Sequence, residues 1–395
     1  MFEPDRWLLP EGIDEALPAE AERLEAYRRR LIDLYHAWGY ELVMPPFIDY
    51  LDSLLTGTGH DLDLKTFKLT DQLSGRLLGL RADMTPQVAR IDAHRMRPEG
   101  ANRLCYLGTV LHTRPDGFAS TRAPLQVGAE LYGHAGPDSD LEIIRLTLET
   151  LRVCGIESVY MDLGHVGIYR ALIDQAGLTA DQQGELFDML QRKALPEIEA
   201  HVGSLGLGAD LESMLLALSE LNGGDEVLES ARRVLEPAGE PVRLALDYLA
   251  DLADRVRLYY PQVSLHFDLA ELRGYHYHTG LLFAAYVPGE GQEIARGGRY
   301  DEIGAVFGRA RPATGFSTDL KTLVRLSAEP WEAASRAIWA PAEADAGLEA
   351  EIARLRAAGE RVIQALAGEQ LDPRGQGCDR RLVRRGEGWQ IEGVD

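Results

Sequence analysis

The stretch YLGTVLHTRPDGFASTRAPLQVGAELYG, from Tyr106 to Gly133, decides the fold because its second half alternates between two kinds of side chain. One side carries Gln126, Gly128, Glu130 and Tyr132, and the other carries Val127, Ala129 and Leu131. This alternation predicts a strand with one apolar face. The amide of Gln126, the absent side chain at Gly128 and the carboxylate of Glu130 lie on one face of this strand. This arrangement favours the floor of a pocket for a small, polar, partly cationic ligand. The solvated face of an antiparallel sheet would give the same pattern.

The composition indicates a globular chain that works without nucleic acid or membrane. Its 395 residues are 45% hydrophobic, which is enough for one large domain or two ordinary ones. The formal charge of −22 would repel a phosphate backbone. No apolar run approaches the roughly 20 residues of a spanning helix, and the N-terminus resembles no export signal. Cys105, Cys154 and Cys378 are widely separated, which fits a reducing cytoplasm rather than a disulfide framework or a zinc site.

Helical and strand patterns follow one another in an order typical of an α+β fold. Apolar residues at steps of three and four predict a helix over Pro18–Trp38. A turn at Ser74 and Gly75 predicts a hairpin. Ser139 with Glu142 has the pattern of a capping box that opens another helix. We therefore predict a large, mostly antiparallel sheet flanked by helices.

Two composition shifts suggest domain limits. The pattern is purely helical over about 166–256, which we interpret as an insertion within a core that spans 1–325. The remaining residues, 330–395, predict strand, helix, strand and a final hairpin around Gly386 and Gly388, which together form a small α/β domain.

Two further segments carry side chains suited to an amino-acid ligand. LRGYHYHTG places Arg273, Tyr275, Tyr277 and Thr279 at period two, and ARGGRYD, from Ala295, sets two glycines between two arginines. Phenol, guanidinium and tight backbone turns suit a ligand with both an ammonium and a carboxylate. The alternating His276 and His278 could instead suggest a metal site, but the sequence offers no third ligand, so we predict no metal.

Taken in order, these segments resemble the catalytic core of histidyl-tRNA synthetase, a class II aminoacyl-tRNA synthetase, over roughly residues 5–325. RGYHYHT echoes the family signature Arg-Gly-Leu-Asp-Tyr-Tyr-Thr, and Gly-Gly-Arg-Tyr-Asp is intact at 297–301. The family's Gln-x-Gly-x-Glu strand matches Gln126 to Glu130, and its Arg-Pro-Glu-Gly-Thr loop is matched loosely by RADMT at 81–85. The resemblance implies a class II synthetase-like core.

The sequence departs from this family at the positions that contact ATP in the synthetases. Where class II synthetases hold ATP with a motif 2 arginine near an acidic residue, this chain offers His112 and Arg114. In motif 3, Lys321 and Thr322 stand where the family has Glu and Arg. Losing two charge-assisted phosphate contacts should weaken nucleotide or transition-state binding by about 10² to 10⁴. The histidine side is largely kept, a combination that resembles the ATP phosphoribosyltransferase regulatory subunits, which are synthetase paralogues.

This resemblance implies a chain that is not itself an enzyme and needs no cofactor. It implies association with the short-form ATP phosphoribosyltransferase catalytic subunit in the first step of L-histidine biosynthesis, as a homodimer within a hetero-octamer. It also implies that L-histidine binds as a feedback effector. The residues that would bind histidine are Asp83, Thr85, Gln126, Glu130, Arg273 and Tyr277, with His278, Gly297, Gly298 and Tyr300 lining the pocket.

Within that set, the resemblance assigns Asp83, Thr85 and Gln126 to the α-ammonium, Glu130 and Tyr277 to the imidazole, and Arg273 to the carboxylate. Asp83 and His278 depart from the synthetase pattern, which has Glu and Tyr there. Two other functions stay open: an active histidyl-tRNA synthetase, which would show histidine-dependent ATP–pyrophosphate exchange, and a histidine sensor for another partner.

Overall fold

The computed structural model describes residues 7–56, 60–115, 121–272, 277–329, 337–368, 372–386 and 388–394. The chain divides into a large unit, Leu24–Glu329 with the N-terminal residues to Glu15, and a small unit, Pro330–Asp395 with Ala16–Arg23.

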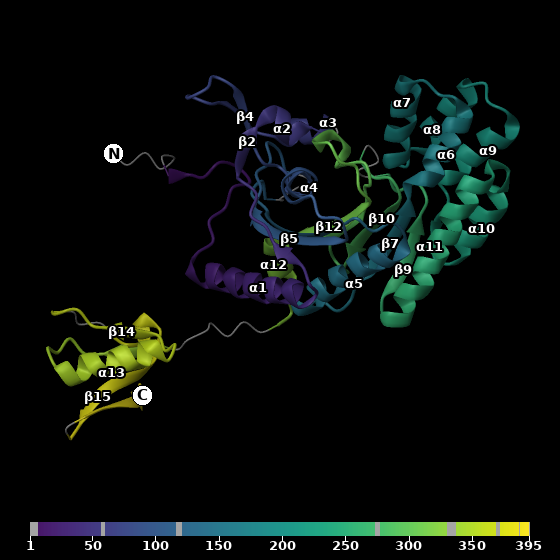
Figure 1. The fold of residues 1–395 in the computed structure, drawn as a ribbon. Coiled ribbons are helices and arrows are strands. Elements are labelled where there is room, and N and C mark those ends of the chain that lie inside the picture. Colours follow the sequence, from purple (N-terminus) through teal and green to yellow (C-terminus); the bar gives the residue numbers. More distant parts are fainter. Residues whose placement is uncertain are drawn as a thin grey trace. The chain divides into compact units, whose positions relative to one another are not determined.

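A nine-stranded sheet is the centre of the large unit (Figure 1). Its strands, in spatial order, are β1 (Glu41–Leu42), β5 (Asn102–Thr109), β6 (Leu125–Tyr132), β12 (Ala313–Asp319), β11 (Ala295–Arg299), β10 (Leu281–Tyr286), β7 (Tyr160–His165), β9 (Ser264–Asp268) and β8 (Asn222–Gly223). The neighbours are antiparallel except β1 with β5 and β7 with β9. The predicted α+β architecture, with a large and mostly antiparallel sheet, is confirmed.

The strand that the opening stretch predicts is β6, and its two faces differ as the alternation requires. Val127, Ala129 and Leu131 belong to the large apolar core. That core includes α1 (Pro18–Ala37) and α5 (Pro137–Val153), which lie on one side of the sheet in Figure 1. The opposite face carries Tyr132 in a second cluster with Val88 of α4 (Thr85–Arg90).

A small three-stranded sheet flanks this second face. It has the order β2 (Ile48–Tyr50), β4 (Leu77–Leu80), β3 (Lys68–Thr70), with α2 (Leu51–Leu55) and α3 (His60–Lys65) between β2 and β3. The predicted hairpin is β3–β4, whose turn includes Gly75 at φ +70°. The chain then enters α4, which continues as the π-helix Ile91–Met96. The loop before α4 lies over the start of β6, where the Met84 amide donates to the Gln126 side chain.

The helical block packs beside β7 and β9. It comprises α6 (Val166–Ala176), α7 (Ala180–Gln191), α8 (Leu195–Ser204), α9 (Ala209–Leu218), α10 (Glu226–Val234) and α11 (Glu240–Tyr259). The prediction of helices alone is wrong at β8, because Asn222 and Gly223 pair with Phe267 and Asp268 of β9. Thr179 and Gln182 form a complete capping box at the start of α7.

The capping box predicted at Ser139 is wrong. The N-cap of α5 is Gly136, and no side chain caps that end. Ser139 Oγ donates to the carbonyls of His134 and Gly136 and accepts from Arg299, while Glu142 pairs with Arg103. The serine is used for a buried arginine instead of for the helix end.

Among its described residues, the small unit has a mixed four-stranded sheet packed with helix α13. Its strands follow the order β14 (Val362–Gln364), β13 (Ala337–Ala340), β15 (Cys378–Arg385), β16 (Gly388–Gly393). Helix α13 (Ala346–Ala357) buries Leu348, Ile352 and Leu355 against Ile338 and Leu382. Asp345 begins the helix by accepting from the Leu348 amide at 2.7 Å.

Candidate functional site: a pocket over the central sheet

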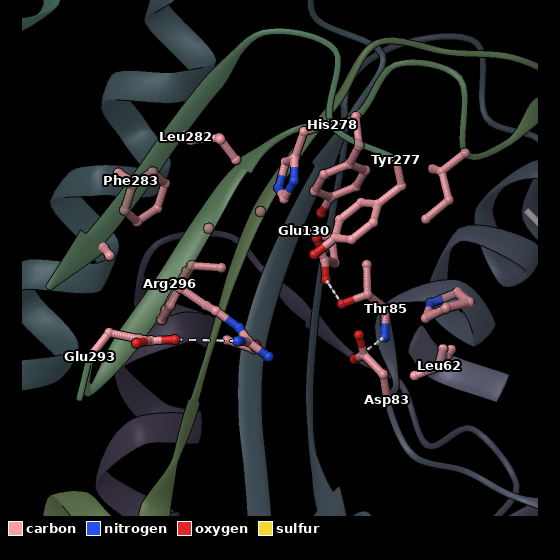
Figure 2. A pocket seen from close by; sticks show the side chains of 18 of the residues that line it. Leu62, Asp83, Thr85, Glu130, Tyr277, His278, Leu282, Phe283, Glu293 and Arg296 are labelled. Atoms are coloured by element: carbon pink, nitrogen blue, oxygen red, sulfur yellow. Dashed lines mark hydrogen bonds and ion pairs between the residues drawn. The ribbon is translucent and has the colours of Figure 1, made fainter. Parts of the chain in front are cut away.

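A cavity of about 380 Å³ opens over the face of β6, β12, β11 and β10 (Figure 2). This volume lies in the range of pockets for small molecules. Its lining residues are Leu62, Lys65, Asp83, Thr85, Pro86, Glu130, Phe187, Gln191, Glu271, Tyr277, His278, Leu282, Phe283, Ala284, Glu293, Arg296, Gly297, Tyr300, Ile303, Gly315, Phe316 and Ser317. The sheet therefore forms the floor, and α3, α7 and the start of α4 supply the walls.

Glu130 is the carboxylate at the bottom of this pocket and is only 1% exposed. Its Oε1 accepts hydrogen bonds from Thr85 Oγ1 at 2.9 Å and from the Tyr106 hydroxyl at 3.0 Å. Its Oε2 is buried and has no hydrogen-bond partner among the described residues. Burial raises the pKa of Glu130 well above its ordinary range, against the lowering effect of the two hydroxyl donors. A buried acceptor without a donor is costly unless a ligand supplies one.

Glycines keep the space around this free oxygen open. Glu130 lies opposite Gly315 of β12, and Gly315 lies opposite Gly298 of β11. A Cβ on Gly315 would overlap both Glu130 Oε2 and the Tyr300 hydroxyl. The Tyr300 oxygen is likewise buried without a partner in the described part of the chain. An acceptor and a hydroxyl therefore face the same small space.

The loop before α4 brings a second carboxylate to the pocket wall. Asp83 Oδ1 accepts from the Thr85 amide at 3.1 Å and from Gln126 Nε2 at 2.8 Å. The Gln126 carbonyl oxygen in turn accepts from the Met84 amide at 2.9 Å. Gln126, predicted as a ligand contact, thus lies behind Asp83 and uses both ends of its amide to position this loop.

Aromatic rings form the far end of the pocket. The ring centroids of Tyr277 and His278 lie 4.2 Å apart, and Tyr300 lies 6.4 Å from Tyr277. Arg170 of α6 donates to the His278 carbonyl at 2.7 Å, which ties this segment to the helical block. A Cβ on Gly298 would overlap the His278 ring, so Gly298 lies behind that ring rather than at the pocket surface.

Of the predicted site residues, the structure brings Asp83, Thr85, Glu130, Tyr277, His278, Gly297 and Tyr300 to the cavity wall. Arg273, predicted to bind the carboxylate, lies outside the described residues, as do its neighbours to His276.

Sequence reasoning missed several wall residues. Arg296 and Glu293 lie near β11, and Phe187 and Gln191 belong to α7. The signal for Arg296 was available, because strand alternation puts it on the same face as Gly298 within ARGGRYD. The α7 residues had no such signal, since they join the site through packing of distant segments.

The residues that replace the synthetase nucleotide contacts make other interactions. His112 Nε2 lies 2.9 Å from the Ala82 carbonyl oxygen. Lys321 Nζ pairs with Asp14 Oδ2 at 2.9 Å. Thr322 Oγ1 donates to Asp319 Oδ2 at 2.9 Å, at the start of α12 (Leu320–Leu326). These side chains are used for local structure.

A buried arginine fixes the end of β11 next to the pocket. Arg299 donates Nε to Asp140 Oδ2 at 3.0 Å and Nη2 to Asp140 Oδ1 at 2.9 Å. Tyr248 of α11 also donates to Asp140. The Arg299 carbonyl accepts from the Thr279 amide at 2.7 Å, two residues after Tyr277. This network holds the two signature segments together.

Within the described residues, no group of three or more His, Cys, Asp or Glu side chains is arranged to hold a metal ion. Among the helices of the same residues, none has the length and apolarity that crossing a membrane requires.

Comparisons with known proteins agree with the fold, and they match the core and the C-terminal residues to two different family models. Residues 12–323 match the family model of histidyl-tRNA synthetase. Residues 335–392 match the model of the ATP phosphoribosyltransferase subunit HisZ C-terminal domain. A histidyl-tRNA synthetase from Nostoc sp. PCC 7120 superposes with a TM-score of 0.75 at 18% identity over 95% of this chain and 91% of that one, which bears on the fold alone.

Relatives of higher sequence identity are named ATP phosphoribosyltransferase regulatory subunits. An ATP phosphoribosyltransferase regulatory subunit from Thioalkalivibrio sulfidiphilus is 67% identical over 97% of each chain, and one from Ectopseudomonas mendocina is 58% identical over 98% of each. A crystal structure titled ATP phosphoribosyltransferase regulatory subunit/histidyl-tRNA synthetase, from Bacillus halodurans, matches with a TM-score of 0.82 at 28% identity, covering 95% of this chain and 97% of that one. The predicted synthetase-like core and regulatory character are confirmed, and the chain belongs to the family of ATP phosphoribosyltransferase regulatory subunits.

Proposed function

We propose that this chain binds the short-form ATP phosphoribosyltransferase catalytic subunit, raises its rate of phosphoribosyl-ATP formation, and senses L-histidine as a feedback inhibitor. The names of the relatives support the partnership with a catalytic subunit. We propose that it acts as a homodimer within a hetero-octamer. The buried, unpaired state of Cys105, Cys154 and Cys378 supports work in the reducing cytoplasm.

The observation that carries the histidine proposal is the unpartnered, buried Oε2 of Glu130 opposite a glycine. An imidazole N–H supplies the missing donor, and the ring fits beside the Tyr277 and Tyr300 rings. Charge-assisted hydrogen bonds are about twice as strong as neutral ones, so a carboxylate selects a ring that carries N–H donors over an apolar ring of similar size.

The remaining groups of the pocket suit the ends of an amino acid. Asp83 at the wall offers a carboxylate to the α-ammonium, and Thr85 adds a hydroxyl beside it. Gln126 acts by holding Asp83 in place. The resemblance assigns the ligand carboxylate to Arg273, which stays a proposal.

No reaction is proposed at this pocket. Adenylation would need cationic contacts to the triphosphate, but Thr322, bonded to Asp319, stands where the family has its motif 3 arginine, and the neighbouring Lys321 is paired with Asp14. Histidine therefore acts here by binding alone. It can shift the complex between an active and an inhibited state only by its difference in affinity for the two, commonly about 1–3 kcal/mol.

The test is the rate of phosphoribosyl-ATP formation by the short-form catalytic subunit from the same source, with and without this chain, followed by titration with histidine. We expect a rise on addition and a fall with histidine. In a complex assembled with Glu130→Ala we expect the rise without the fall. No rise with two folded proteins, or histidine-dependent ATP–pyrophosphate exchange by this chain alone, would contradict the proposal.

A further inference from the structure

The strand register divides the pocket floor into two rows. Glu130, Gly315 and Gly298 are cross-strand neighbours and form one row, and Gly128, Ser317 and Arg296 form the next. Both rows face the same side because side chains on a strand repeat every two residues. Adjacent rows are about 7 Å apart, since each strand residue rises about 3.4 Å.

Arg296 reaches from the second row into the cavity. Its side chain extends from β11 toward the middle of the pocket, on the side opposite Asp83 and Thr85 (Figure 2). Gly128 occupies the β6 position of the same row. The Tyr106 side chain covers this glycine, because a Cβ there would meet its ring and hydroxyl, so the open part of the row lies over Ser317, next to Arg296.

The spacing of the rows matches the length of one amino acid. If the imidazole donates to Glu130, the Cβ and Cα atoms carry the carboxylate roughly 6 Å farther. With the ammonium at Asp83, the carboxylate points to the other wall, where Arg296 stands. A guanidinium presents five N–H donors in a planar fork that fits a carboxylate.

Glu293 helps to orient this guanidinium. Arg296 Nη1 lies 3.3 Å from Glu293 Oε1, and the two side chains are 53% and 13% exposed. The arginine is therefore held at the pocket rim by a partner that sits deeper in the wall. Because the guanidinium has several donors, contact with Glu293 leaves it able to share a second carboxylate.

We propose that Arg296 binds the carboxylate of the ligand and makes the pocket selective for the α-amino acid over the corresponding amino alcohol, an inference that rests on the proposed histidine site. The resemblance gives the carboxylate to Arg273, which lies outside the described residues, so Arg296 is proposed here as a separate contact to the same group. Neither the resemblance nor the descriptions of the relatives assigns a role to Arg296. It acts as a specificity residue for binding.

The test compares L-histidine with L-histidinol, which keeps the imidazole and ammonium but has a hydroxymethyl group in place of the carboxylate. Both ligands are titrated calorimetrically into the wild type, Arg296→Ala and Arg296→Lys. Arg325→Ala is the matched control, because Arg325 also pairs with a glutamate, Glu290, at the surface but lies on α12. Circular dichroism checks the fold of each variant.

We expect the wild type to prefer histidine over histidinol, and Arg296→Ala to lose roughly tenfold or more of its histidine affinity while histidinol binding changes less than about twofold. Arg296→Lys should keep part of the preference, and Arg325→Ala all of it. A variant Arg296→Ala that keeps the wild-type preference, or loses both ligands equally, would overturn the inference. A folded wild type that binds neither ligand would overturn the proposed histidine site as well, so the two failures are distinguishable.

Discussion

Two buried carboxylates of the large unit, Asp140 and Glu130, differ in what surrounds them. Asp140 is 0% exposed and Glu130 1%. Asp140 accepts hydrogen bonds from Nε and Nη2 of Arg299 and from the Tyr248 hydroxyl. Glu130 accepts hydrogen bonds from two neutral hydroxyls at Oε1, and its Oε2 has no hydrogen-bond partner among the described residues.

This difference separates a structural charge from one suited to a ligand. A buried ion pair with complete hydrogen bonding costs little to keep but much to break. A buried carboxylate with an unused oxygen lowers stability, and such costs are typically found at functional sites. Burial alone therefore does not distinguish the two roles, whereas the partners of each oxygen do.

The largest expected effect comes from removing the satisfied carboxylate. Asp140→Ala leaves the Arg299 guanidinium buried without its main partner, so we expect a loss of about 3–5 kcal/mol in the free energy of unfolding, measured by urea denaturation. Asp138→Ala is the control on the same helix, because its partner Arg255 contacts it at the surface, and its midpoint should hardly move. Equal shifts for both variants would show that the Asp140 network is not structural.

The next effect tests the open space beside Glu130. Gly315→Ala would place a methyl group where Glu130 Oε2 and the Tyr300 hydroxyl face each other. We expect at least a tenfold loss of histidine affinity by calorimetry, because the site for the ring is filled. Gly297→Ala is unsuitable as a control, since its Cβ would meet Phe283. Gly291→Ala, at a position with an ordinary φ and nothing near its Cβ, is the control and should bind histidine as the wild type does. Unchanged binding by Gly315→Ala would place the ligand elsewhere.

A smaller effect concerns the pH dependence of stability. Burial raises the pKa of Glu130 above its ordinary value of 4.5 in the folded chain. The unfolded chain therefore ionises first, and the folded state loses stability as the pH rises from about 4.5 through the raised pKa. Glu130→Gln has no carboxyl to ionise and avoids this loss. Its free energy of unfolding should therefore exceed that of the wild type by an amount that grows from pH 4.5 upward to about 0.5–2 kcal/mol. A variant that is less stable than wild type at neutral pH would mean that the charge is compensated.

The smallest effects come from removing one hydroxyl from each carboxylate. Tyr248→Phe should cost about 1 kcal/mol of unfolding free energy and leave histidine affinity unchanged, because its partner Asp140 is structural. Tyr106→Phe should instead alter histidine affinity, since its hydroxyl donates to the same oxygen of Glu130 as Thr85. The comparison would be undermined if both variants changed affinity to the same extent.

Much of the fold could be predicted because it is recorded in local patterns. The alternation along β6 and the apolar period of α1 each follow from side-chain spacing that the chain displays directly. Ser139 was misassigned because a serine before a glutamate predicts a cap only if no stronger partner competes. Here Arg299, which lies far along the chain, donates a hydrogen bond to the Ser139 hydroxyl, so this serine contacts the buried arginine and does not cap the helix.

The site was predictable where it lies on strands and less so elsewhere. Glu130 and Tyr300 follow from strand signatures, whereas Phe187 and Gln191 reach the cavity only because the helical block packs beside the sheet. The amide of Gln126 could not be recognised from sequence as a support for Asp83, because its orientation depends on the loop before α4.

The most direct test of the account is a calorimetric titration of L-histidine into the wild type and Glu130→Gln at neutral pH, with circular dichroism to verify both folds. The variant keeps the size of the side chain and an acceptor for Thr85 and Tyr106 but loses the charge. We predict that the wild type binds histidine and that the variant binds at least tenfold more weakly while being no less stable. Equal affinities for the two proteins, or no binding by a folded wild type, would contradict the assignment of Glu130 as the group that recognises the ligand.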